Sequence, residues 1–199
     1  MSLYIESISI ESDMTCPLLS YHQARVNRTA GERCGIDLQA IIQSKVNELT
    51  DGQQHKLRIL YDQSGVQQVT IQPYLVRLIR SLTVVDIAFD YDRKTANRDA
   101  INSAFARRGD SDDILMVRDG LITDTSYGNV ALHKDGIWYT PESPLLQGCR
   151  RQSLLDRGLI ITKKLRIETL DSYPHLMMFN GLIRFGRVII PTERIFNRL

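Results

Sequence analysis

The sequence predicts an α+β protein with a small N-terminal lobe and a larger, mainly antiparallel β lobe flanked by helices. Residues 3–10 alternate apolar and polar side chains as a strand does. Apolar residues at three-and-four spacing then predict helices over residues 19–33 and 38–49. Later in the chain, short strand-like runs are joined by Asp-Gly turns at residues 119–120 and 135–136, which are strong hairpin signals.

The small lobe is expected to continue with a hairpin. Residues 56–62 and 66–73 are strand-like and flank a glycine, and residues 76–89 form a β-rich stretch. No low-complexity linker interrupts the chain. We place the boundary at the end of the β-rich stretch, so that the small α+β lobe covers residues 1–88 and the larger lobe covers residues 89–199.

The larger lobe is expected to hold helices at residues 97–108 and 148–156. Its strands are expected where short apolar runs are bounded by turn residues: 114–118, 121–124, 129–133, 137–140, 159–166, 176–179 and 187–190. Asp124 therefore falls at the end of a strand in an antiparallel sheet.

Composition indicates a globular protein without a disulfide or metal framework. The chain has 199 residues, 43% of them hydrophobic, which is enough to bury a core. Cys16, Cys34 and Cys149 are an odd number with no close pair, which favours reduced thiols over disulfides or a zinc site. The histidines share no spacing typical of metal ligands, so we expect no metal.

Charge and hydropathy restrict the partners. The net charge is +2 with both signs interspersed, and basic pairs such as residues 150–151 and 163–164 are too short to indicate nucleic-acid binding. No apolar run approaches the roughly 20 residues that cross a bilayer, and residues 1–10 lack the pattern of a signal peptide. We expect a cytoplasmic protein that binds neither nucleic acid nor membranes.

Three segments carry groups suited to chemistry. Lys94 stands in Asp-Arg-Lys-Thr-Ala-Asn, and Asp124 stands in Gly-Leu-Ile-Thr-Asp-Thr-Ser-Tyr-Gly-Asn. The segment Leu-Gln-Gly-Cys-Arg at residues 146–150 precedes a predicted helix. In order, these segments supply an amine, a carboxylate and a helix N-terminus whose backbone N–H groups bind anions.

The order of these segments and the residues that flank each group resemble the class IV aminotransferases. This is the fold-type IV pyridoxal phosphate family, which includes D-amino-acid and branched-chain aminotransferases and aminodeoxychorismate lyase. In the family the lysine stands in a Lys-x-x-Asn context, as Lys94 and Asn97 do. The acid follows Gly-x-hydrophobic-Thr and precedes a polar turn ending in Asn, as Asp124 and Asn129 do. The resemblance implies a two-lobed fold-type IV protein with pyridoxal 5'-phosphate as its cofactor.

The resemblance gives Lys94 and Asp124 their expected roles. Lys94 would form the Schiff base with the cofactor and act as the general base. Asp124 would face the ring nitrogen and keep it protonated, although the family usually has Glu there. The alternatives are a solvated surface lysine and an aspartate that caps the turn at Thr125.

Other expected cofactor contacts follow from shorter matches. Arg25 stands in a His-x-x-Arg segment whose arginine contacts the phosphate, although a plain surface arginine is the alternative. Leu146 would pack on the ring, while Gly148 and Cys149 would offer amides to the phosphate. Arg150 replaces the usual Thr, so its guanidinium either compensates for the lost hydroxyl or points away.

Two further segments complete the expected site. Asn180 and Gly181 stand in Phe-Asn-Gly-Leu, which is similar to the Phe-Asn-Ala-Leu segment of aminodeoxychorismate lyases, where the asparagine lies beside the phosphate. Ser126 has a hydroxyl suited to supporting the site. Tyr127 is either a direct contact or a packed aromatic ring.

The leading interpretation is therefore a PLP-dependent enzyme, an aminotransferase or an aminodeoxychorismate-lyase-like enzyme, acting on an amino acid or keto acid. Residues 4–8 are similar to the family's Phe-Glu-Thr strand, but the segment that normally precedes it is absent, which implies a shortened N-terminal lobe. That shortening, together with Arg150, leaves open a cofactor-binding protein without turnover. An unrelated α+β binding domain is the third interpretation. By resemblance alone we expect a homodimer.

Overall fold

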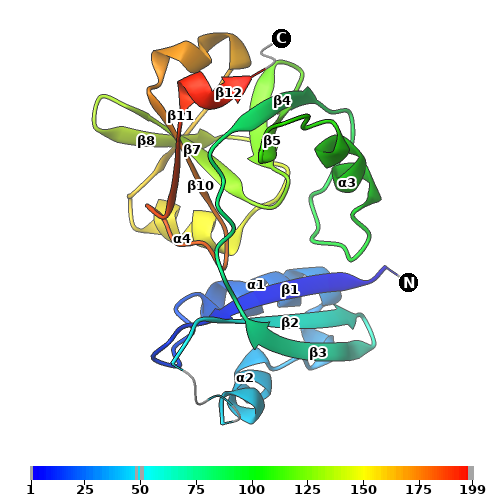
Figure 1. The fold of residues 1–199 in the computed structure, drawn as a ribbon. Helices are drawn as coiled ribbons and strands as arrows, with labels where there is room; N and C mark the ends of the chain where they lie inside the picture. The colour runs from blue at the N-terminus through cyan, green and yellow to red at the C-terminus, as the bar shows by residue number, and fades with distance from the viewer. Residues whose placement is uncertain (1, 48, 50–51, 197–199) are drawn as a thin grey trace. The chain divides into compact units, whose positions relative to one another are not determined.

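The computed structural model describes residues 2–47, 49 and 52–196, and the chain forms two compact units (Figure 1). The first unit comprises Met1–Val76 and Arg93–Asn97. The second comprises Arg77–Asp92 and Arg98–Leu199. The predicted division into residues 1–88 and 89–199 stays a prediction.

The first unit contains an antiparallel sheet in the order β1-β2-β3. Its strands are β1 (Tyr4–Ile10), β2 (His55–Asp62) and β3 (Gly65–Pro73). Alternate residues of β2 are buried, as expected for a strand with one face against a core. Glu6 pairs with Ile59 of β2 and so lies on the same face as that core residue.

Helix α1 (Leu19–Ala30) covers this face and runs alongside β1 in Figure 1. The expected helix over residues 19–33 ends earlier, because Gly31 has a φ of 87° that no right-handed helix accommodates. One 3-10 turn, η1 (Glu32–Cys34), follows it.

Helix α2 (Leu38–Val46) begins at Asp37, whose side chain accepts a hydrogen bond from the Ala40 amide. It is shorter than the helix expected over residues 38–49, and Glu48 of that range lies outside the described residues. Leu38 and Ile42 of α2 are buried in the core of the first unit.

The chain returns to the first unit at residues 93–97, which lie along the edge of β1. Thr95 forms an antiparallel bridge with Tyr4. The Ile5 amide donates to the Lys94 carbonyl at 2.9 Å, and the Ala96 amide donates to Leu3 at 2.7 Å. These backbone bonds fix the position of Lys94 relative to β1.

Among its described residues, the second unit forms one nine-stranded sheet with the path β11-β10-β7-β6-β5-β4-β12, from which β8 and β9 branch at β7. The strands are β4 (Leu82–Asp86), β5 (Asp113–Arg118), β6 (Leu121–Thr125), β7 (Asn129–Lys134), β8 (Ile137–Pro141), β9 (Ile161–Lys163), β10 (His175–Phe179), β11 (Val188–Pro191) and β12 (Ile195–Phe196).

The sheet is mainly antiparallel, as expected, and its Asp-Gly turns form as the sequence predicts. Asp119 and Gly120 have φ values of 53° and 73°, and Asp135 and Gly136 have values of 50° and 78°. Two successive left-handed residues are typical of the tight hairpin turn that suits the twist of the strands. The parallel pairs β4–β5, β4–β12 and β8–β9 were not expected.

Two α-helices flank this sheet, α3 (Asp99–Ala106) and α4 (Cys149–Asp156). In Figure 1, α3 lies beside β5. Its residues Ile101 and Ala104 are buried. The 3-10 helices η2 (Ile167–Ser172) and η3 (Thr192–Arg194) complete the described elements. The mixed α+β class, with a sheet-dominated body and few helices, is confirmed.

No helix in the part of the chain that the structure describes combines the length and apolar character needed to cross a bilayer.

Candidate functional site

Asp124, near the end of β6, lies in a closed hydrogen-bond network. Its Oδ1 accepts from Asn129 Nδ2 at 2.8 Å, and its Oδ2 accepts from the Leu146 amide at 2.9 Å. The same Nδ2 also donates to the Leu146 carbonyl at 2.8 Å. The carboxylate is thereby fixed at two points by β7 and by the loop before α4.

Burial raises the pKa of Asp124 to about 6. The side chain is only 4% exposed, so the charged form loses most of its hydration. The Leu146 amide, the Asn129 side chain and the charge of Arg151 lower the pKa, but they do not outweigh burial. Asp124 therefore loses its proton at a higher pH than an ordinary aspartate does.

The loop that presents Leu146 is held by Arg151 of α4. The guanidinium donates to the Pro141 carbonyl at 2.7 Å and to Gln147 Oε1 at 2.9 Å. Arg151 is 3% exposed, and burial lowers its pKa while the nearby Asp124 raises it. A planar group with several donors suits this task because it bridges two points of one loop.

Gly148 is the residue at which this loop enters α4. Its backbone is extended, with φ −72° and ψ 142°, and its carbonyl accepts the Gln152 amide at 3.0 Å. A Cβ added at Gly148 would overlap Asn129 Oδ1, so no larger residue fits while Asn129 keeps its place. Cys149 follows as the first helical residue and is buried. The first amides of a helix point outward and can bind an anion.

Ser126 and Tyr127 lie in the tight turn between β6 and β7. The Thr125 amide donates to the Gly128 carbonyl at 2.8 Å, which closes the turn. Arg98 Nη2 donates to the Ser126 carbonyl at 2.7 Å. The turn is thus anchored to the segment that leads into α3.

Asn180 organises the turn that follows β10. Its Nδ2 donates to the Tyr127 carbonyl at 3.0 Å, and its Oδ1 accepts from the Leu182 and Ile183 amides, both at 2.8 Å. The sequence predicted that this asparagine lies beside a phosphate. Its side chain bonds backbone groups of two turns, and the contact with a phosphate stays a prediction.

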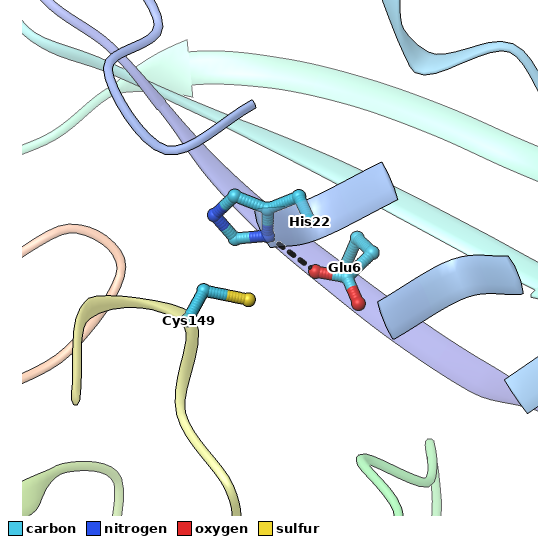
Figure 2. A group of neighbouring side chains, drawn as sticks. All are labelled: Glu6, His22 and Cys149. Atoms are coloured by element: carbon cyan, nitrogen blue, oxygen red, sulfur yellow. Dashed lines mark hydrogen bonds and ion pairs between the residues drawn. The ribbon is translucent and has the colours of Figure 1, made fainter. Parts of the chain in front are cut away.

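In the first unit, Arg25 and His22 of α1 meet Glu6 of β1. Arg25 donates from Nε to Glu6 Oε1 at 2.7 Å and from Nη2 to Oε2 at 2.6 Å. His22 Nδ1 lies 2.6 Å from Oε2 of the same carboxylate, as Figure 2 shows. The helical spacing of three puts both side chains on one face of α1, toward the sheet.

These partners decide the charge of Glu6. Complete burial raises its pKa, but the charge of Arg25 and the hydrogen bonds from His22 and Arg25 outweigh it and lower the pKa to about 2. Glu6 is therefore ionised at neutral pH. Arg25 meets a buried counter-ion through Nε and Nη2, and its expected contact with a phosphate stays a prediction.

Lys94 is half-buried, and its segment belongs to the first unit. Arg25 belongs to that unit too. The other expected site residues belong to the second unit: Asp124, Ser126, Tyr127, Leu146, Gly148, Cys149, Arg150, Asn180 and Gly181. Within the second unit, hydrogen bonds join Asp124 to Leu146, and join Asn180 to Tyr127 and Arg150.

Sequence reasoning missed three residues that hold these groups. Asn129 was recognised as part of a motif, but its two bonds were not foreseen. Arg151 ends the segment that begins at Leu146, and its place in that motif was the available signal. Glu6 stands at an inward position of β1, where a charged residue in an apolar alternation signals a buried partner.

Residues 4–190 match the family model described as amino-transferase class IV. The chain therefore belongs to the class IV aminotransferase family, as its motifs predicted.

Similar proteins support this assignment. The chain is 29% identical over 170 residues to an uncharacterised protein of Haemophilus influenzae, a match covering 82% of this chain and 89% of that protein. A crystal structure from Haemophilus somnus, provisionally named a 4-amino-4-deoxychorismate lyase, is 27% identical with a TM-score of 0.85. It covers 92% of this chain and 97% of that one. A Mycobacterium tuberculosis aminotransferase of hypothetical assignment, solved with bound PLP, shares the fold at 18% identity and a TM-score of 0.77, with coverage of 99% and 82%.

Pyridoxal 5'-phosphate is the cofactor of this family. The Asp124 carboxylate fits the group, because its two oxygens carry about four lone pairs in all, and the hydrogen bonds from Asn129, Leu146 and Leu145 do not occupy all of them. An acceptor thus remains for a ring N–H. The first turn of α4 contains no acidic residue, which suits it to a phosphate dianion.

Proposed function

We propose that this chain is a PLP-dependent enzyme that acts on an amino acid or a keto acid through a Schiff base at Lys94. Family membership over residues 4–190 supports the cofactor and the reaction class. The observation that carries the proposal furthest is the network around Asp124, which presents a buried carboxylate whose orientation is fixed at both oxygens.

Lys94 is proposed as the catalytic residue. Its Nζ would hold the cofactor and, once a substrate amine has displaced it, would accept the proton from the substrate Cα. When PLP is bound, the chemistry it supplies is an electron sink for the pair left by that proton. The backbone bonds between β1 and the Lys94 segment fix the main chain from which this amine extends.

Asp124 is proposed to keep a proton on the ring nitrogen. A carboxylate at hydrogen-bond distance from a basic nitrogen stabilises its protonated form. Asp124 is one methylene shorter than the family's usual Glu, and the Leu146 amide and Asn129 fix where its oxygens lie. Removing either donor would leave the carboxylate free to turn away.

The phosphate is proposed to lie at the start of α4. Backbone amides of Gly148 and Cys149 would donate to it, as helix N-termini do to anions. Arg25 would add a charged donor, and Leu146 would pack on the ring. The remaining expected contacts stay as proposed cofactor-binding residues: Ser126, Tyr127, Asn180 and Gly181. Arg150 is proposed to support cofactor binding through the turn that it bonds.

Within the class, lyase chemistry is favoured by one finding. The Haemophilus somnus structure named a lyase is 27% identical to this chain. The two chains also have nearly the same extent, since the match covers 97% of that chain. The protein would then release pyruvate from aminodeoxychorismate, and transamination of an amino acid is the alternative reaction. A cofactor-binding protein without turnover remains the second candidate, because Arg150 stands where the family has Thr.

The test is turnover by PLP-loaded protein on three substrates: aminodeoxychorismate, D-alanine, and L-branched amino acids with a keto-acid acceptor. Pyruvate release from the first that is abolished in Lys94→Ala supports the lyase, and keto-acid formation from the others supports the aminotransferase. Bound cofactor with no turnover on any substrate supports the second candidate. Light scattering and cell fractionation would test the proposed homodimer and cytoplasmic location.

A further inference from the structure

Arg150 bonds the turn after β10 through two donors. Its Nε donates to the Asn180 carbonyl at 2.6 Å, and its Nη2 donates to the Gly181 carbonyl at 3.1 Å. Both carbonyls belong to consecutive residues, and the guanidinium spans them side-on. Hydrogen bonds from a charged donor are stronger than those between neutral groups.

The bonded turn reaches a second turn through Asn180. The asparagine side chain holds the Leu182 and Ile183 amides on one side and the Tyr127 carbonyl on the other. Arg150 is the second residue of α4. The first turn of α4, the turn after β10 and the turn between β6 and β7 are therefore joined in one hydrogen-bonded chain.

The type of residue at position 150 matters for this arrangement. The planar fork of arginine can reach two neighbouring carbonyls at once, whereas lysine offers a single point of charge and threonine a short hydroxyl. A cation in the first turn of a helix is also opposed by the helix dipole. α4 carries Arg150 and Arg151 in that turn and no acidic residue, so the bonds to Asn180 and Gly181 offset an unfavourable placement.

We propose that Arg150 is a positioning residue that sets the turn of residues 180–183 against the N-terminus of α4, and that it supports cofactor affinity through this turn and not by touching the phosphate. The part concerning cofactor affinity rests on the proposed function. The part concerning the turn concerns the protein without cofactor and can be tested alone.

The first measurement is amide hydrogen exchange in the cofactor-free protein. In Arg150→Ala, the amides of Leu182 and Ile183 should exchange about tenfold faster, because the turn that holds them loses its anchor. Arg157→Ala is the matched control, since Arg157 is an exposed arginine at the other end of α4. Unchanged exchange at these amides would overturn the structural part of the proposal.

The second measurement is the Kd of PLP for the wild type, Arg150→Ala and Arg150→Lys, below the melting temperature of each. Positioning through two carbonyls requires the fork, so both variants should bind about tenfold more weakly and within about threefold of each other. Wild-type affinity in Arg150→Lys with weak binding in Arg150→Ala would show a direct charge contact to phosphate. Unchanged affinity in both variants would show a purely local role, and either result overturns the proposal.

The controls separate this proposal from the proposed function. If the wild-type protein itself fails to bind PLP, the function fails and the cofactor part of the inference falls with it. If the wild type binds PLP and both variants bind it as tightly as the wild type does, only the inference fails.

Discussion

The Leu146 amide donates a hydrogen bond to Asp124 Oδ2 across 22 residues of sequence and fixes the carboxylate to the loop before α4. The bond joins two motifs that the sequence shows only as separate segments. Two further contacts hold the same loop: Arg151 bonds the Pro141 carbonyl and Gln147, and Gly148 packs against Asn129. The following expectations test this network and the one around Glu6.

The stability of the cofactor-free protein should fall as the pH rises from about 4 to about 7, because of Asp124. Its folded pKa of about 6 lies above the ordinary value of 3.8, so the folded state binds more protons in this window. Ionisation of the buried group should cost roughly 2–3 kcal/mol. The stability that protonated Asp124 contributes is fully present below about pH 4 and is lost as the pH rises through about 6.

Urea unfolding of the wild type and Asp124→Asn across this pH range measures the effect. The difference in unfolding free energy between the two proteins should shift in favour of the variant as the pH rises. Asp110→Asn, at an exposed aspartate, should show no such trend. A difference that stays constant from pH 4 to pH 7 would mean that Asp124 titrates normally.

Glu6→Gln should destabilise the protein by about 3–5 kcal/mol at pH 7, because it leaves the buried Arg25 without its counter-ion. The folded pKa of Glu6, about 2, lies below the ordinary 4.5, so its contribution is present above pH 4.5 and lost as the pH falls toward 2. The variant and the wild type should therefore converge in acid.

Chemical denaturation of Glu6→Gln and of Glu32→Gln supplies the comparison. Glu32 is exposed, and its substitution should change stability by less than about 0.5 kcal/mol. Equal, small effects of the two substitutions would contradict a stabilising role for the pair formed by Glu6 and Arg25.

Gly148→Ala should cost about 1–3 kcal/mol, because its Cβ would overlap Asn129 Oδ1 in a packed region. The backbone at Gly148 suits any residue, so the cost is steric alone. Asn129→Ala removes the obstructing atom, and in that background Gly148→Ala should cost almost nothing. Additive effects in this double-mutant cycle would show that the two residues do not interfere.

Gly158 provides a contrast to Gly148. It has a φ of 64° and open space around a Cβ, so Gly158→Ala should cost about 1–2 kcal/mol through its backbone and should not depend on Asn129.

Much of the fold follows from local sequence signals. The Asp-Gly turns at Gly120 and Gly136 specify their hairpins through residues that tolerate positive φ, and apolar alternation specifies β1 and β2. Strand β9 could not be bounded in the same way. Its three residues pair in parallel with β8, and such a pairing depends on distant chain segments and not on its own composition.

The motifs of the candidate site could be recognised in the sequence, but the hydrogen bonds that their side chains form could not. Asp124, Lys94 and Asn180 were all selected from the residues next to them in the sequence. The partners of Asn180 depend on which turns the sheet brings together, and the partner of Arg25 depends on the register that turns Glu6 inward. Such contacts form between residues far apart in sequence, so no spacing rule reveals them.

Borohydride reduction of the PLP-loaded protein, followed by peptide mapping with mass spectrometry, tests the central claim most directly. Reduction makes the bond between a lysine and the cofactor permanent. The proposed function predicts one modified peptide, with the pyridoxyl phosphate on Lys94 and none in Lys94→Arg. A label on a different lysine, or no label on a protein that has bound the cofactor, would contradict it.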